Sequence, residues 1–79
     1  MPPPTTRIQA SADLGTAVRA ARKRAGLTLA ETAGLTDVGM RFLSELENGK
    51  PTVRLDKVLH VLAALGLQLH LASRDEQEG

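Results

Sequence analysis

The sequence predicts an all-α domain of four to five short helices, with one β-strand near its C-terminal end. Three observations support this class. Apolar residues recur at helical spacing through most of the chain, start and stop residues divide that pattern into short segments, and strict alternation is convincing only at residues 67–71. At 79 residues the chain is expected to be one domain whose aliphatic core is small enough that oligomerisation would add stability.

The first helix is expected from about Asp13 to Ala25, with Ser11 or Asp13 as its cap and Gly26 in the place of a left-handed terminator. Residues 1–10 before it form a flexible arm, because three consecutive prolines cannot start a helix. The apolar residues of this helix recur at i, i+4, i+7 and i+11, and are Leu14, Val18, Ala21 and Ala25.

A capping box opens the second helix. In Thr28-Leu29-Ala30-Glu31, the Thr28 hydroxyl can accept from the third helical N–H while the Glu31 side chain accepts from the Thr28 N–H. The helix is therefore expected to begin at Leu29 and to last about two turns, because four turn-favouring residues follow: Gly34, Thr36, Asp37 and Gly39.

The third helix is expected to begin near Met40 and to end at Glu47 or Asn48, with Gly49 as its terminator and Pro51 just beyond. A helix of about eight residues is unstable alone in water, so both short helices must be held by packing. The apolar stripe that holds the third helix consists of Phe42, Leu43 and Leu46.

The fourth helix ends at Gly66 and carries Asp56 in its first turn, where a carboxylate is favoured by the helix dipole. Its broad apolar face consists of Leu55, Val58, Leu59, Val61, Leu62 and Leu65. The strict alternation that follows predicts one half-buried strand, whose apolar residues are Leu67, Leu69 and Leu71.

A single strand leaves its backbone N–H and C=O groups without partners. No second strand is convincing in this sequence, unless residues 5–9 serve. The simplest partner is the same strand from another copy of the chain. The pattern therefore predicts a two-fold homodimer held in part by residues 67–71.

Composition argues against several functions. The chain has no Cys, no Trp, no Tyr and one Phe, which excludes a disulfide framework or thiolate site and disfavours base stacking on single strands. His60 and His70 lie on different predicted elements without a carboxylate cluster, so neither a metal nor another cofactor is expected. An enzyme is also not expected, because no paired carboxylates, activated nucleophile or phosphate-binding glycine loop is recognisable.

No apolar run approaches the roughly 18 to 20 residues of a membrane helix, and the start lacks a signal-peptide core, so a soluble cytoplasmic protein is expected. The net charge of +1 conceals an asymmetry. Residues 1–71 hold nine Lys or Arg against six Asp or Glu, whereas residues 72–79 hold one against three. The body is basic, and residues 72–79 are expected to be a disordered acidic tail.

Two short helices joined by a glycine-containing turn predict a helix-turn-helix over residues 11–71, and hence binding to double-stranded DNA. The second helix of such a motif enters the major groove, while the first points free N–H groups at phosphate. With Leu43 and Leu46 inward, four residues of the third helix face outward: Met40, Arg41, Ser44 and Glu45.

Arg41 is the expected base reader, because a guanidinium can bond guanine O6 and N7 together. Met40 could touch a thymine methyl, and Glu45 could accept from a cytosine amino group or orient Arg41. Alternatively, Arg41 and Glu45 form an ordinary surface ion pair and Met40 is a loosely packed helix end. The remaining expected DNA contacts come from the capping residues and the loop after Gly49, and are Thr28, Leu29, Gly39, Lys50, Thr52 and Arg54.

The runs RKRAGLT, FLSELENGKPT and LDKVLHVLAALGLQL resemble the lambda/Cro-type (XRE) repressors, and specifically the HipB-like antitoxins. The resemblance covers roughly Asp13 to Leu71 and implies a lambda repressor-like bundle. It also implies a buried ion pair between Arg22 and Glu47. Of the other helix-one cations, Arg19 or Lys23 would then remain for phosphate, although the helix dipole alone would explain the whole cluster.

The resemblance further implies a strand shared between subunits, repression of the protein's own operon, and sequestration of a HipA-like serine/threonine kinase toxin. Two positions depart from the family pattern. Leu29 replaces a common Gln that contacts phosphate, and Gly39 replaces a capping Ser, Thr or Lys.

Two functions remain open at this stage. One is a dimeric repressor and antitoxin that binds a palindromic operator with half-sites about 34 Å apart. The other is a protein-interaction module that holds a partner enzyme and whose DNA binding is vestigial, as the modest net charge, Leu29 and Glu45 would suit.

Overall fold

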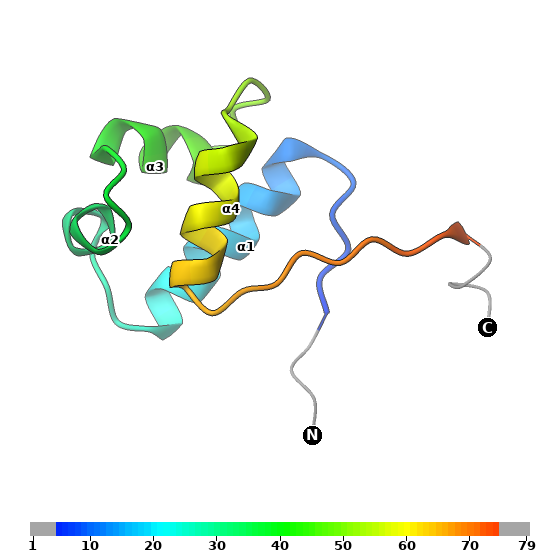
Figure 1. The fold of residues 1–79 in the computed structure, drawn as a ribbon, viewed down its shortest axis with the longest axis horizontal. Coiled ribbons are helices and arrows are strands. Elements are labelled where there is room, and N and C mark those ends of the chain that lie inside the picture. Colours follow the sequence, from blue (N-terminus) through cyan, green and yellow to red (C-terminus); the bar gives the residue numbers. More distant parts are fainter. Residues whose placement is uncertain (1–4, 75–79) are drawn as a thin grey trace.

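The computed structural model describes residues 5–74, which form an all-α fold with four helices. These are α1 (Ser11–Arg24), α2 (Leu29–Thr36), α3 (Met40–Glu47) and α4 (Leu55–Ala64). Figure 1 shows the four helices gathered in one bundle, with the segments before α1 and after α4 leaving it on the same side. The predictions for residues 1–4 and 75–79 lie outside the described part of the chain.

Helix α1 begins two residues earlier than predicted. Its cap is Ala10, which has no polar side chain, so the expectation of Ser11 or Asp13 as the cap is wrong. Asp13 instead occupies the third helical position, where its carboxylate accepts from the backbone N–H groups of Gln9 and Ala10 at 2.9 and 3.0 Å. This is half of a capping box, with the carboxylate also favoured by the positive helix end.

Helix α2 has the predicted start. The Glu31 N–H donates to Thr28 Oγ1 at 3.0 Å, and the Thr28 N–H donates to Glu31 Oε1 at 2.9 Å. The helix ends where Asp37 adopts a left-handed conformation, with φ of 57°. Two threonines that the sequence analysis did not place in the core, Thr32 and Thr36, are fully buried and donate to the carbonyls one turn earlier, at 2.9 and 2.7 Å.

The core lies where α3 packs against α1 and α2, with α4 packing on α2. Its buried aliphatic residues are Val18, Val38, Leu43, Leu46, Val58, Val61 and Leu62. Burial of each such side chain contributes about 1.5 to 3 kcal/mol. The predicted apolar face of α4 is too broad, because Leu55 and Leu59 are exposed. Ala25 is exposed as well, so the apolar stripe of α1 ends one turn early.

Helix α1 and the end of α3 meet with backbone against backbone. Gly15 is buried in α1, and a Cβ atom there would lie 2.7 Å from the carbonyl oxygen of Glu47. Gly49 has φ of 83°, and a Cβ at this residue would lie 2.8 Å from the Cα of Ala12. Both glycines are therefore required by close approach, and together they fix how deeply α3 sits against α1.

The predicted strand at residues 67–71 is not formed in the single chain. Leu67 follows Gly66 and packs against the core, but Leu69 is exposed and Leu71 is 96% exposed. No strand is assigned anywhere in residues 5–74, including residues 5–9, the alternative partner considered above. A strand requires a neighbouring backbone, and pairing with a second copy remains a prediction.

Candidate nucleic-acid interface

Helix α3, which corresponds to the groove-entering helix of the predicted motif (the recognition helix), is anchored from behind by Arg22 and Glu47. These are the two residues of the expected ion pair. Arg22 Nε lies 2.6 Å from Glu47 Oε2, and the Arg22 NH2 group donates to Glu47 Oε1 at 3.0 Å. The third guanidinium nitrogen donates to the Leu27 carbonyl at 2.8 Å. The side chains are only 10% and 6% exposed, so the last turn of α3 is held to α1 by a bidentate bond inside the protein.

This contact also determines the charge state of Arg22. The hydrogen bonds that Arg22 donates to the Glu47 carboxylate raise the pKa of the guanidinium further, against an opposing effect of burial. Glu47 therefore stabilises the charged form of Arg22. Because its donors are used inside the fold, Arg22 is not available to DNA, unlike the exposed Arg19, Lys23 and Arg24 on the same helix.

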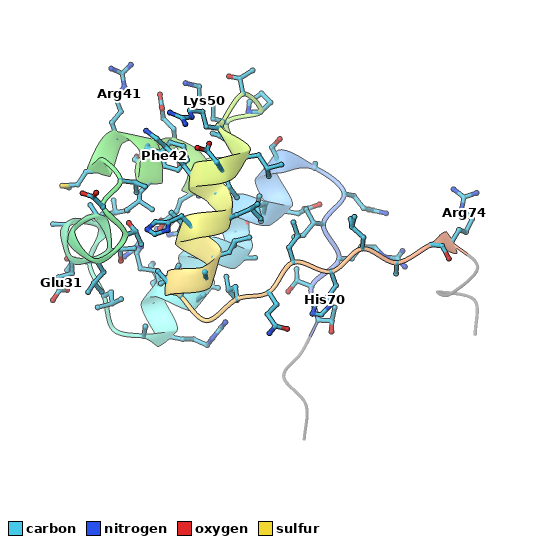
Figure 2. All side chains as sticks on the ribbon, in the orientation of Figure 1. Glu31, Arg41, Phe42, Lys50, His70 and Arg74 are labelled. Carbon is cyan, nitrogen blue, oxygen red and sulfur yellow. The ribbon has the colours of Figure 1, made fainter. Side chains whose placement is uncertain are left out.

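The outward face of α3 starts with two exposed residues, Met40 and Arg41. Arg41 is 91% exposed, and Figure 2 shows it projecting away from the bundle, on the same edge of the molecule as Lys50. Ser44 and Glu45, one turn further along, are partly buried. Of the four residues predicted to face outward, the two in the first turn are thus exposed and the other two are only partly so. Contact of this face with a DNA groove about 12 Å wide stays a prediction.

Glu45 lies between two cations. Its Oε2 atom is 3.6 Å from Arg41 Nε and 3.2 Å from Lys50 Nζ. Arg41 can be a base reader or a member of a surface ion pair, and both interpretations are compatible with this geometry. The long contact with Glu45 involves only Nε, so the two terminal nitrogens of the guanidinium take no part in it.

The N-terminus of α2 lies beside the recognition helix. Thr28 caps it, and the Thr28 N–H lowers the pKa of the Glu31 carboxyl by donating to it. The Leu29 side chain packs against the core, so only its backbone N–H is left to face a phosphate. A helix N-terminus with free N–H groups favours an anion of this kind.

A shallow depression of about 190 Å³ joins α1, the start of α2 and α3. Arg19 and Leu29 line it together with Ser44 and Asn48, above the buried Arg22–Glu47 pair. Asn48 was not singled out in the sequence, although a polar residue one turn after Ser44 was a usable signal. Its side-chain nitrogen lies 3.4 Å from Ser44 Oγ.

The other predicted contacts are placed less favourably. Gly39 caps α3 without a side-chain bond, and Thr52 is exposed in the loop before α4. Arg54 donates to the Asp56 carboxylate at 2.6 Å, which lowers the pKa of Asp56. The charge of Arg54 is therefore largely balanced by its own neighbour before any phosphate approaches.

An interaction that the sequence did not reveal joins α3 to α4. The Lys57 ammonium group lies 5.5 Å from the centre of the Phe42 ring, within the range of a cation–π contact. Over residues 5–74 there is no group of three metal-binding side chains, and none of the helices there has the length and apolarity to cross a membrane.

Helix α3 is short, exposed in its first turn, packed across the short helix α2 and anchored from behind. This arrangement defines a helix-turn-helix protein. The family model for the helix-turn-helix domain matches residues 13–74, and the chain belongs to this family. It is an XRE-like member whose fold is close to that of HipB, as the resemblance implied. The family is one of DNA-binding transcriptional regulators and is not a class of enzymes.

Three similar proteins illustrate the relationship. An uncharacterised HTH-type transcriptional regulator, y4mF of Sinorhizobium fredii, is 44% identical over 71 residues, which are 90% of this chain and 93% of the relative. HipB in a HipB–O4 20mer complex superposes with a TM-score of 0.80 at 23% identity, covering 89% of this chain and 99% of that one. The clp gene regulator ClgR from C. glutamicum gives 0.68 at 34% identity, covering 82% of each chain.

Proposed function

We propose that this protein is a sequence-specific transcriptional repressor that binds a palindromic operator as a homodimer and serves as the antitoxin of a HipBA-type operon. The observation that carries the DNA-binding part is the exposed first turn of α3, with Arg41 91% exposed on a helix fixed by the buried Arg22–Glu47 pair. A rigidly held helix with an exposed arginine is suited to reading base edges, because the reader must reach the bases in a defined register.

The phosphate contacts in this proposal come from two helices. Leu29 at the start of α2 and the exposed Arg19 on α1 border one depression, next to Ser44 on α3. Lys50 stands at the other end of α3, on the same edge of the molecule as Arg41. DNA backbone could thus be held on both sides of the base-reading turn, which is how contacts to phosphate set the register of a recognition helix.

The homodimer is supported by the exposure of the C-terminal segment. Leu69 and Leu71 are exposed, and Leu55 and Leu59 on α4 are exposed as well. A second copy that pairs with residues 67–71 would satisfy their backbone groups and cover apolar surface at the same time. Two-fold symmetry then implies a palindromic operator with half-sites one helical turn apart, about 34 Å.

The antitoxin part rests on similarity of fold. One of the neighbouring solved structures is a HipA–HipB–O2–O3 complex, with a TM-score of 0.80 at 23% identity. By analogy the partner protein of this chain is a HipA-like kinase toxin. Co-purification of the chain with the product of an adjacent kinase gene, and loss of kinase toxicity on co-expression, would test this part separately.

The DNA-binding part is tested by titrating the protein with the DNA upstream of its own gene, with scrambled duplex as competitor. We expect preferential binding that weakens steeply with salt, with a slope of about −0.9 in log K for each phosphate contact. Arg41→Ala should lower operator affinity by about 1 to 3 kcal/mol, since one bidentate base contact is lost. Unchanged operator binding by that variant would remove Arg41 from the role of base reader.

A second candidate function is an interaction module whose main role is to hold a partner enzyme. The pairing of Glu45 with Lys50 and of Arg54 with Asp56 favours it, because these contacts neutralise cations near the proposed interface. This function predicts weak binding that is indifferent to sequence and has a shallow salt dependence.

A further inference from the structure

We propose that Glu45 is a selectivity residue, which weakens binding to DNA of the wrong sequence because its carboxylate partly neutralises Lys50 and Arg41 and so reduces the attraction of both cations to phosphates. This inference rests on the DNA-binding function proposed above. It assigns Glu45 a role different from contact with a base, and it makes Lys50 a restrained cation whose contribution depends on Glu45.

The placement of Lys50 follows from the way α3 ends. The Lys50 N–H donates to the Glu45 carbonyl at 3.0 Å, and the Gly49 N–H donates to the Leu46 carbonyl at 3.0 Å, with Gly49 at φ of 83°. This pair of bonds is a Schellman motif, which brings the second residue after the helix back over its last turn. Lys50 is therefore fixed beside Glu45 by its backbone before the side chains meet at 3.2 Å.

The contact with Arg41 is selective for one part of the guanidinium. Glu45 Oε2 faces Nε at 3.6 Å, so the two terminal nitrogens of Arg41 remain available. Those terminal nitrogens can bond O6 and N7 of a guanine while the Glu45 contact persists. The negative charge of Glu45 lies beside the same guanidinium and repels a phosphate that approaches it, so Glu45 permits base reading and opposes phosphate binding.

The electrostatic consequence differs between the two kinds of DNA. Sequence-independent binding depends almost entirely on cations that reach phosphates. One carboxylate shared by two cations leaves a single net positive charge on three side chains. The Glu45 side chain is 32% exposed, on the face of α3 proposed to meet DNA. Random DNA therefore loses the equivalent of about one phosphate contact. The operator recovers much of that loss through the base contact of Arg41.

The test compares Glu45→Gln with the wild-type protein on upstream and scrambled duplexes at two salt concentrations. Affinity of Glu45→Gln for the scrambled duplex should rise about 5- to 10-fold near 0.1 M salt, and its salt slope should steepen by about one unit, as for one added phosphate contact. Operator affinity should change less than about 3-fold, so the ratio of operator affinity to scrambled-duplex affinity falls.

Two further variants separate the local effect from net charge. Asp37→Asn makes the same charge change in the turn between α2 and α3, and asparagine tolerates the left-handed conformation found there. Asp37→Asn should bind both duplexes as the wild type does. In the double variant Glu45→Gln/Lys50→Gln, the salt slope on scrambled DNA should return to the wild-type value.

Three outcomes would overturn the inference while leaving the proposed function intact. These are a Glu45→Gln variant that binds scrambled DNA like the wild type, an Asp37→Asn variant whose affinity for scrambled DNA rises as much as that of Glu45→Gln, and a Glu45→Gln variant whose operator affinity falls more than about 10-fold because a cytosine contact is lost. A wild-type protein that does not distinguish the upstream duplex from the scrambled one would instead overturn the proposed function, and this result precedes any variant.

Discussion

Removing one member of the Arg22–Glu47 pair should destabilise the domain far more than removing both. In Glu47→Leu, the guanidinium of Arg22 stays 10% exposed with only the Leu27 carbonyl as its partner. In Arg22→Met, the Glu47 carboxylate stays 6% exposed and loses both bonds from Arg22. Each single change should cost about 3 to 5 kcal/mol, because an uncompensated charge remains buried.

That cost is large for a chain of this length. A folded domain of 79 residues has a total free energy of unfolding of roughly 4 to 12 kcal/mol. Either single variant should therefore lose about a quarter or more of its stability. In Arg22→Met/Glu47→Leu, no charge is buried, and the principal remaining cost is the Leu27 carbonyl without its donor, about 1 to 3 kcal/mol. The double variant should thus be more stable than either single variant.

Urea unfolding followed by far-ultraviolet circular dichroism gives the three free energies needed for this cycle. We expect a coupling energy of several kcal/mol between Arg22 and Glu47, since the second substitution removes the buried charge that the first one leaves without a partner. Additive losses in the double variant, or single variants that each lose less than about 1 kcal/mol, would refute the assignment of a buried, mutually dependent pair.

Three other predictions concern the scaffold. Gly15→Ala should lower the melting temperature and cost about 1 to 3 kcal/mol, because the new methyl group meets the carbonyl of Glu47; a wild-type melting temperature would contradict this. Gly34→Ala should raise the free energy of unfolding by about 0.5 to 1 kcal/mol without changing DNA affinity, because a Cβ there meets open space and an exposed helix interior favours alanine. A reduced DNA affinity would contradict this and would mean that DNA lies against α2 at Gly34. The lowered pKa of Glu31 means that the stability it contributes is present above about pH 4.5 and is lost as the pH falls through its folded value, so Glu31→Gln should flatten the acid side of a melting-temperature profile between about pH 6 and 3, whereas an unchanged profile would exclude this contribution.

Local chemistry explains which helix boundaries were predictable. The capping box at Thr28 and the glycine after α3, Gly49, act within a few residues, so the start of α2 and the end of α3 can be read from the sequence. The start of α1 was misplaced because its cap, Ala10, carries no polar group. The usable signal was Asp13, whose carboxylate reaches back to two N–H groups in front of the helix.

Tertiary packing decides what the sequence left open. Periodicity marks α4 as apolar on a broad face, but it does not say which part of that face the other helices cover, and Leu55 and Leu59 are exposed. The buried position of Gly15 likewise depends on the approach of α3 from a distant part of the chain. Pairing of residues 67–71 requires a second backbone, and residues 5–74 of the single chain form no strand beside them.

Within the candidate interface, the outward positions of Met40 and Arg41 followed from helical geometry, whereas the contact between Glu45 and Lys50 did not. Lys50 lies beyond the end of α3, and only the left-handed turn at Gly49 brings it back towards the helix. The expected pairing of Arg41 with Glu45 is present at 3.6 Å, but the closer cation is Lys50, at 3.2 Å.

The contact of α1 with the end of α3 through Gly15 and Gly49 has a consequence for engineering. No side chain of either glycine stands between the two backbones, so the distance between the helices is set by the radii of main-chain atoms and not by rotamers. Residues on the outer surface of α3 can then be exchanged without shifting the helix axis. Swapping the outward residues Met40, Arg41 and Ser44 should therefore retarget the protein to another DNA sequence while the framework beneath them stays in place.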